Sequence, residues 1–354
     1  MTLLVTMTEG DESDPSIPEK PSKLRIWMLE MRLPFLTGSI TPVLLGTAMA
    51  WSMHGVFLLD VFLLTLVVGV CLHLGANISN DYFDHISTAD DINVEYVRPF
   101  TGGSRMIQLG WLSPREVLAG SFVAYGIAVI VGLYLAFTRD LLLLAFGIVG
   151  AASGFFYTAP PFRFVSRGYG EVFIGLNFGV LMVLGSFYVQ VLTLAWEPVI
   201  ASLPVALLIT AVLYINEFPD AKADEAAGKL TVVVRLGKKR AATGYGVLMA
   251  FVYGTLVFGI LLNFVALFAS VALTTLPLGI FATRHAIANH SNTPALVPAN
   301  AATVVNHLLT GLYLTIAYVM HGFGLSLEIV LLVAVVMLLV VLMQYRSLNT
   351  PPKS

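Results

Sequence analysis

The chain has 354 residues, of which 57% are hydrophobic and only 11% are charged, and its mean hydropathy is +0.85. An ordinary soluble domain carries about 25% charged residues, so this composition excludes a soluble globular protein and indicates a protein that crosses a lipid bilayer many times. The net charge of −2 says little by itself. Nothing in the sequence indicates a nucleic-acid partner.

Long apolar runs repeat along most of the chain. A helix needs about 20 apolar residues to cross a bilayer, and repeated runs of this length favour helices over the shorter alternating strands of a membrane barrel. We therefore predict an all-α polytopic transmembrane bundle of about nine or ten helices. The predicted spans lie near residues 34–53, 58–79, 116–138, 140–157, 171–194, 197–216, 241–262, 264–282, 303–320 and 324–343.

Short tails are predicted at both ends of a transmembrane domain that covers residues 23–345. Residues 1–22 are acidic and proline-rich, unlike the basic start of a cleaved signal peptide. We expect them to form a disordered cytoplasmic tail. Residues 346–354 are the predicted C-terminal tail.

The basic residues are distributed unevenly between the two sides of this topology. Eighteen of the 19 Lys and Arg fall on the side that holds both termini and the loops after the even-numbered spans, and only Arg139 falls on the other side. Cytoplasmic loops carry such an excess. The sequence therefore predicts a multi-pass protein of the cell membrane with both termini in the cytoplasm.

The second span ends in a group of amides and carboxylates. Within a continuing helix Asn77 and Asp81 are four residues apart, as are Asn80 and Asp84, so these side chains share one face. Such oxygen ligands suit Mg²⁺, which usually takes one or two carboxylates and leaves other positions for water and substrate phosphate. The alternative is an ordinary solvated helix end. Two further carboxylates, Asp90 and Asp91, follow in the predicted loop.

That loop continues into a glycine-rich turn between two arginines, Arg98 and Arg105, with Gln108 behind them. The backbone N–H groups of Gly102 and Gly103 and the forked guanidinium donors are suited to phosphate oxygens. Alone this pattern is weak. Beside an acidic metal site it is what a diphosphate needs, because metal and arginines together neutralise it.

The loop after the fourth span runs from Tyr157 through Pro160 and Pro161 to Arg167. The prolines end the helix, and the following glycines permit a tight return into the fifth span. The sequence leaves two interpretations equally open: a cytoplasmic connector with ordinary positive charges, or a part of the site.

The sixth span ends in a second acidic cluster. Asn216, Asp220 and Asp224 are spaced by four residues, which stacks them along one helix face, and Lys229 follows in a basic loop. Both clusters lie on the predicted cytoplasmic side. Two such clusters at matching helix ends predict one shared metal site.

The two clusters together resemble the paired aspartate motifs of the UbiA superfamily of intramembrane prenyltransferases. The similarity covers most of the chain from Arg32 to Gly237. Within the superfamily, the spacing of Asp84 and Asp90, the arginine-rich glycine loop and the segment from Tyr157 to Glu171 look most like 1,4-dihydroxy-2-naphthoate polyprenyltransferases, which make demethylmenaquinone.

The sequence departs from this subfamily at a few positions. Glu217 and Pro219 stand where relatives often have Asn and Arg, and Gly102-Gly103 stands where Gly-Pro is common. The chain also has one apolar run more than the nine helices typical of the superfamily.

The resemblance implies Mg²⁺-dependent transfer of a polyprenyl group from polyprenyl diphosphate to an aromatic acceptor. The metal-binding and catalytic residues that it implies are Asp81, Asp84, Asp220 and Asp224. The implied substrate-binding residues are Asn77, Asn80, Asp90, Arg98, Arg105, Tyr157, Arg167, Asn216 and Lys229.

Other functions remain open at this point. Within the enzyme class, the acceptor is 1,4-dihydroxy-2-naphthoate or one of 4-hydroxybenzoate, homogentisate and a glycerol-phosphate lipid. From another class, a cation-coupled transporter also carries intramembrane acids, but it places them near the bilayer midplane. Here both clusters lie at the ends of spans beside basic loops, which argues against a transporter.

Overall fold

The computed structural model describes residues 20–98 and 100–349, and over these residues it contains helices and no strand. The predicted tail at residues 1–22 therefore falls almost wholly outside the described residues, as do residues 350–354. The elements at the N-terminal side are α2 (Lys23–Glu30), η1 (Leu33–Leu36), α3 (Thr37–His54), α4 (Leu59–Ile86), α5 (Ala89–Ile92), α6 (Pro114–Thr138) and α7 (Leu143–Phe155).

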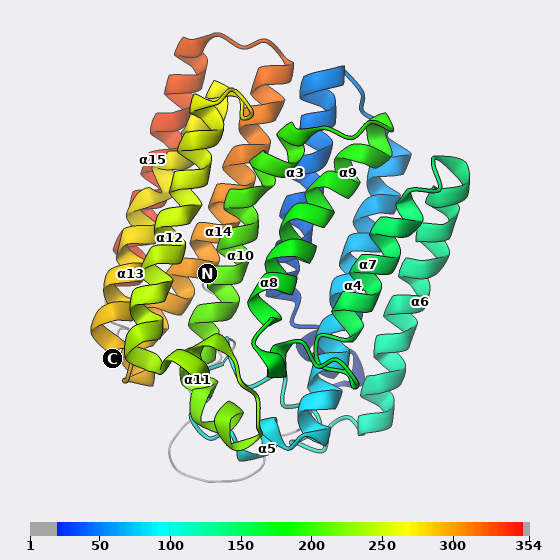
Figure 1. The fold of residues 1–354 in the computed structure, drawn as a ribbon, viewed down its shortest axis with the longest axis vertical. Helices are drawn as coiled ribbons and strands as arrows, with labels where there is room; N and C mark the ends of the chain where they lie inside the picture. The colour runs from blue at the N-terminus through cyan, green and yellow to red at the C-terminus, as the bar shows by residue number, and fades with distance from the viewer. Residues whose placement is uncertain (1–19, 99, 350–354) are drawn as a thin grey trace.

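The second part of the chain continues the same pattern of long helices with short connecting elements (Figure 1). Its elements are η2 (Val165–Arg167), α8 (Gly170–Gly175), η3 (Leu176–Leu181), α9 (Met182–Val191), α10 (Trp196–Ala226), α11 (Val232–Leu236), α12 (Lys238–Leu261), η4 (Leu267–Thr275), α13 (Leu276–Asn289), α14 (Thr293–Gly322) and α15 (Leu327–Asn349). The element η3 is a π-helical turn that joins α8 to α9.

All ten predicted apolar runs are helical. Nine helical segments of the described chain are long and apolar enough to cross a membrane, and the remaining run forms the shorter α7, with 13 residues. Helix α15 continues through Arg346 to Asn349, so the predicted C-terminal tail begins inside a helix. Only 17% of the apolar window of α15 is buried, which places this helix on the outside of the bundle.

Two helices extend well beyond their apolar runs. The prediction ended the second span at residue 79 and the sixth at 216, whereas α4 reaches Ile86 and α10 reaches Ala226. The length of an apolar run gives the part of a helix that crosses the membrane. The helix itself can continue beyond that run through polar residues. These extensions carry the aspartates, and in Figure 1 they point toward the end of the bundle that holds α5 and α11.

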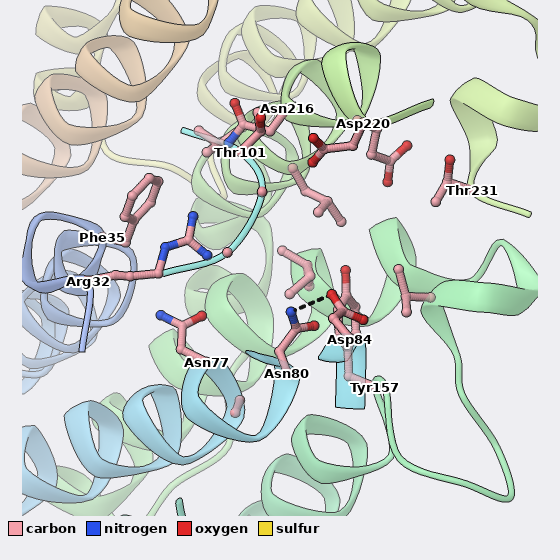
Figure 2. A pocket seen from close by; sticks show the side chains of 18 of the residues that line it. Arg32, Phe35, Asn77, Asn80, Asp84, Thr101, Tyr157, Asn216, Asp220 and Thr231 are labelled. Carbon is pink, nitrogen blue, oxygen red and sulfur yellow. Dashed lines mark hydrogen bonds between the residues drawn. The ribbon is translucent and has the colours of Figure 1, made fainter. Parts of the chain in front are cut away.

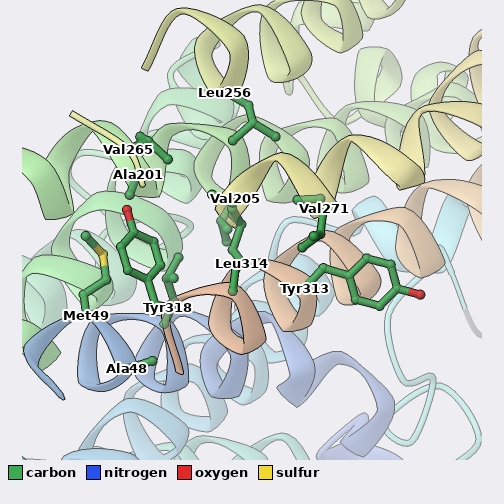
Figure 3. Close-up of a cluster of buried hydrophobic side chains, with 14 of the residues drawn as sticks. Ala48, Met49, Ala201, Val205, Leu256, Val265, Val271, Tyr313, Leu314 and Tyr318 are labelled. Carbon is green, nitrogen blue, oxygen red and sulfur yellow. The ribbon is translucent and has the colours of Figure 1, made fainter. Parts of the chain in front are cut away.

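The main apolar core lies among α3, α9, α10 and α14, with η4 and α15 packed against it (Figure 3). Small residues allow close helix contact, as is common where bundles pack in lipid. A Cβ on Gly46 of α3 would lie 2.2 Å from the carbonyl oxygen of Val183 in α9. A Cβ on Gly179 of η3 would lie equally close, 2.2 Å, to the Cβ of Ala206 in α10. The first contact holds α3 against α9, and the second holds η3 against α10, whose polar extension follows.

Candidate active site

A cavity of about 230 Å³ lies between the polar extensions of α4 and α10. Figure 2 shows Asn77, Asn80 and Asp84 from α4 facing Asn216 and Asp220 from α10 across this space. Of the predicted site residues, nine line the cavity: Asn77, Asn80, Asp84, Asp90, Tyr157, Asn216, Asp220, Asp224 and Lys229. Residues far apart in the sequence thus meet at one site.

Lys229 connects the two aspartate motifs. Its Nζ lies 2.5 Å from Oδ1 of Asp84 on α4 and 3.8 Å from Oδ1 of Asp224 on α10. The chain reaches this position because Gly228 has φ +75°, a left-handed conformation that turns it back after α10. Burial opposes the charge of Lys229, but the carboxylates of Asp84 and Asp224 outweigh it and raise its pKa above the ordinary value. Lys229 therefore places a positive charge between the two motifs.

Asp81 is buried just behind the cavity wall. Its Oδ2 accepts a hydrogen bond of 2.9 Å from the backbone N–H of Ser104, and its Oδ1 is buried without a hydrogen-bond partner. Gly103 has φ +68°, and a Cβ there would lie 2.7 Å from Oδ2 of Asp90 and 3.1 Å from Oδ1 of Asp81. Proline cannot adopt this φ, so the Gly-Gly departure from the Gly-Pro pattern is explained by how this loop packs on the carboxylates.

Asp90 and Asp91 have different surroundings. Asp90 is buried in α5, where burial first and then the charges of Asp84 and Asp81 raise its pKa to about 9. Asp91 is exposed, accepts a hydrogen bond of 3.1 Å from Gln108 and lies 3.4 Å from His85. The structure thus places Asp90 in the site and Asp91 outside it.

Asp220 is held by a residue that the sequence did not single out. The side-chain amide of Asn93 donates a 2.7 Å hydrogen bond to Oδ1 of Asp220, and Asn93 is itself buried and lines the cavity. Asn93 belongs to the segment that follows the first motif. It therefore ties that segment directly to the second motif.

Asn216 is oriented from α14. The side-chain amide of Asn300 donates to Oδ1 of Asn216 at 2.8 Å and to the carbonyl of Ile215 at 3.2 Å. That carbonyl needs a donor because the residue four positions on is Pro219, which has no N–H. Asn300 thus compensates for the proline and positions Asn216 in the same contact.

This arrangement predicts that Asn300→Leu destabilises the protein by about 1–3 kcal/mol, the cost of leaving a buried carbonyl unpaired. Adding Pro219→Ala should restore the helical N–H and recover most of that loss, which denaturant or thermal unfolding of the purified variants will measure. A double variant no more stable than Asn300→Leu alone would contradict this account.

The three predicted arginines do not line the cavity. Arg98 is exposed, the guanidinium of Arg105 donates to the backbone carbonyl of Asp90 and stacks 4.5 Å from the ring of Tyr96, and Arg167 donates to the carbonyl of Pro161 at 2.9 Å. The guanidinium groups of Arg105 and Arg167 therefore bind loop backbone and do not point into the cavity where a ligand would lie.

Arg32 lines the cavity where the other arginines do not. It has φ +48°, and its guanidinium donates to the carbonyl of Phe100 at 3.3 Å. Figure 2 shows it with Phe35 on the side of the cavity away from Thr231. Its position directly before the first predicted span is the signal that could have found it, but Arg32 was not among the predicted site residues.

Glu30 was also missed. It is fully buried and accepts a hydrogen bond from the Ser104 hydroxyl, whose backbone N–H binds Asp81. Burial first and then the Asp81 charge raise the pKa of Glu30 to about 8.

The profile of the UbiA prenyltransferase family matches residues 39–297 of the chain. The chain belongs to the UbiA prenyltransferase family. Membership in this enzyme family decides between the prenyltransferase and the cation-coupled transporter that the sequence left open. This UbiA protein is a prenyltransferase with many membrane-spanning helices.

Similar proteins agree with this assignment. The UbiA protein is 34% identical to the 1,4-dihydroxy-2-naphthoate octaprenyltransferase of Mycobacterium tuberculosis over 67% of this chain and 78% of that protein. It is 31% identical to the protein of the same name from Bacillus subtilis over 64% of this chain and 70% of that one. A solved structure of a UbiA homologue from Archaeoglobus fulgidus bound to GPP and Mg²⁺ has the same fold, with TM-score 0.54, 15% identity, and 82% and 99% of the two chains covered.

Proposed function

We propose that this protein transfers a polyprenyl group from polyprenyl diphosphate to 1,4-dihydroxy-2-naphthoate, with loss of CO₂, to give demethylmenaquinone. The observation that carries the proposal is the single cavity lined by both aspartate motifs and Lys229. The names of the two bacterial relatives support the acceptor. We also propose that this end of the bundle faces the cytoplasm, which the excess of Lys and Arg there supports.

An apolar cavity of about 140 Å³ provides room for the polyprenyl tail. It continues from the polar cavity, with which it shares His73, Asn177 and Phe178, and runs between α4, α6, α7 and α9. Its far end is lined by Thr65 on α4, which is sixteen residues before Asp81 and so lies about 24 Å away along the helix. A diphosphate between the motifs would leave its tail pointing into this space.

The donor set fits Mg²⁺ that binds together with a diphosphate. The residues are carboxylates, the oxygen ligands that this ion prefers, and Oδ1 of Asp81 is buried without a partner. Within the described residues, no three Asp, Glu, His or Cys side chains converge on one point. Mg²⁺ usually binds one or two carboxylates and completes its coordination with water and substrate phosphate oxygens. Carboxylates on opposite walls of the cavity suit this kind of binding. When bound, the ion would neutralise the diphosphate and stabilise its departure.

The chain's own residues act on the charge that moves during the reaction. The bond between the prenyl C1 and the diphosphate oxygen breaks, and its electron pair leaves with pyrophosphate. Lys229 stabilises that developing charge from a fixed position. The ring carbon that bears the carboxylate then attacks the allylic cation. The bond to the carboxylate breaks, its electrons restore the aromatic ring, and CO₂ leaves.

Filling the apolar cavity should discriminate between donors by length. Gly132 lines this cavity, and a Cβ built on it meets no atom within 4 Å. We expect Gly132→Phe to lower transfer from an octaprenyl donor by about tenfold, a loss of about 1.4 kcal/mol, and to leave a geranyl donor unaffected. Gly126→Phe on the same helix is the matched control, because Gly126 also has free space but lines neither cavity. Equal losses with both donors would contradict the placement of the tail.

The test of the proposed function is a transfer assay. Purified protein is incubated with Mg²⁺, labelled polyprenyl diphosphate and each of four acceptors: 1,4-dihydroxy-2-naphthoate, 4-hydroxybenzoate, homogentisate and glycerol phosphate lipid. We expect prenylated product and CO₂ from the naphthoate. Product from 4-hydroxybenzoate alone would overturn the acceptor, and absence of product from all four would overturn the function.

A further inference from the structure

One carboxyl group in the cavity has no assigned partner. Glu217 of α10 lines the cavity and is only 5% exposed. Neither of its oxygens accepts a hydrogen bond of good geometry, and its neighbouring polar groups are the Glu171 carboxyl and the backbone N–H of Val233. No other carboxyl in the described part of the chain has both oxygens buried and unpartnered.

Such a group is costly unless a donor reaches it. A buried acceptor left without a hydrogen bond destabilises the folded protein, and a charged acceptor does so more strongly. The two cations that line the cavity are engaged elsewhere: Lys229 pairs with Asp84, and Arg32 bonds the Phe100 carbonyl. The free oxygens of Glu217 are therefore available to a donor on a bound molecule.

The surroundings of Glu217 select what that molecule presents. Glu171 lies beside it and is fixed in place, because its Oε1 accepts a 3.0 Å hydrogen bond from the Val232 N–H. Two neighbouring carboxyl groups present oxygen atoms and no positive charge, so this wall does not attract a diphosphate or a carboxylate. Burial first and then the charges of Glu217 and Glu171 raise the pKa of Tyr157 well above its ordinary value, so this lining residue stays a neutral hydroxyl. This wall therefore favours a neutral hydrogen-bond donor.

We propose that Glu217 accepts a hydrogen bond from a ring hydroxyl of the aromatic acceptor and so determines which acceptors bind. This inference rests on the proposed function, because that function supplies a hydroxylated ring. As the ring gives electron density to the new C–C bond, its hydroxyl becomes more acidic and the hydrogen bond to Glu217 strengthens, which favours the transition state. No net proton transfer is required, since departure of CO₂ restores the ring.

The same wall orients the acceptor. Glu217 and Glu171 offer no cation to the acceptor's carboxylate, whereas Arg32 lines the cavity on the side away from Thr231.

The experiment compares Glu217→Leu and Glu217→Gln with Glu225→Gln, a control on the exposed face of the same helix. Each variant is assayed with 1,4-dihydroxy-2-naphthoate and with its monomethyl ethers. We expect Glu217→Leu to raise the acceptor KM at least about tenfold, or about 1.4 kcal/mol, with the donor KM unchanged. Glu217→Gln keeps an acceptor oxygen and should lose less. One of the two monomethyl ethers lacks the hydroxyl that contacts Glu217. It should bind the parent protein as weakly as 1,4-dihydroxy-2-naphthoate binds Glu217→Leu.

Direct binding separates this inference from the proposed function. Binding of the naphthoate is measured by its fluorescence in the presence of Mg²⁺ and pyrophosphate, without a prenyl donor. If the parent binds the naphthoate more tightly than Glu217→Leu but forms no product, the role of Glu217 stands and the proposed function fails. A parent-like acceptor KM and affinity in Glu217→Leu, or equal losses for donor and acceptor, would overturn the inference.

Discussion

Asp84→Asn is expected to lower kcat/KM for prenyl transfer by about 10²- to 10³-fold, the effect typical of removing one fixed group that stabilises transition-state charge. Asp84 lines the cavity, accepts a 3.0 Å hydrogen bond from Asn80 and lies 2.5 Å from Nζ of Lys229. The amide keeps the size of the side chain but removes the charge that would hold Mg²⁺. The measurement is the steady-state rate of prenyl transfer at saturating Mg²⁺.

Asp91→Asn provides the matched control for this prediction. Asp91 follows the same motif but is exposed and bonded to Gln108, outside the cavity. It should keep parent-like activity. Equal rates for Asp84→Asn and the parent would show that the first motif does not act through Asp84.

Lys229→Met is expected to have the second large effect. Lys229 is 8% exposed and lies between Asp84 and Asp224, so its removal leaves two buried carboxylates without their cation. Breaking a buried pair in this way costs about 3–5 kcal/mol. Activity should fall by about 10²-fold or more, because the charge that faces the departing pyrophosphate is also lost. Thermal unfolding and transfer assays measure the two effects.

Lys222→Met tests whether the effects of Lys229→Met on stability and activity depend on the position of that lysine in the cavity. Lys222 also pairs with a carboxylate, at 2.5 Å from Glu95, but its side chain is 73% exposed. Exposed pairs contribute about 0–1 kcal/mol, so this variant should keep nearly full stability and activity. If both lysine variants behaved alike, the bridging role of Lys229 would be wrong.

The sequence predicted the helices and the aspartates for clear physical reasons. Apolar length identified all ten runs, and the spacing of Asn77 and Asp81, like that of Asp220 and Asp224, requires one helix face. Lys229, predicted from the resemblance to bind substrate, lines the cavity three residues after the end of α10.

The loop residues were harder to predict. Arg98, Arg105 and Arg167 have the right charge for a diphosphate, but a loop arginine can bond its own backbone as easily as a ligand, and Arg105 and Arg167 do so here. Arg32 and Asn93 reach the site by tertiary packing that no local spacing encodes. The pairing of Pro219 with Asn300 likewise joins two helices that are far apart in the sequence.

The central claim is that one prenyl diphosphate binds between the two aspartate motifs through Mg²⁺. Its most direct test is equilibrium binding of a non-hydrolysable polyprenyl thiolodiphosphate to purified protein, with Mg²⁺ and with EDTA, for the parent, Asp84→Asn and Asp220→Asn. Asp220 is the relevant partner because it lines the same cavity from α10. We predict tight binding by the parent only with Mg²⁺, and loss of that metal-dependent binding in each variant. Binding that is unchanged by EDTA and by both substitutions would contradict the account.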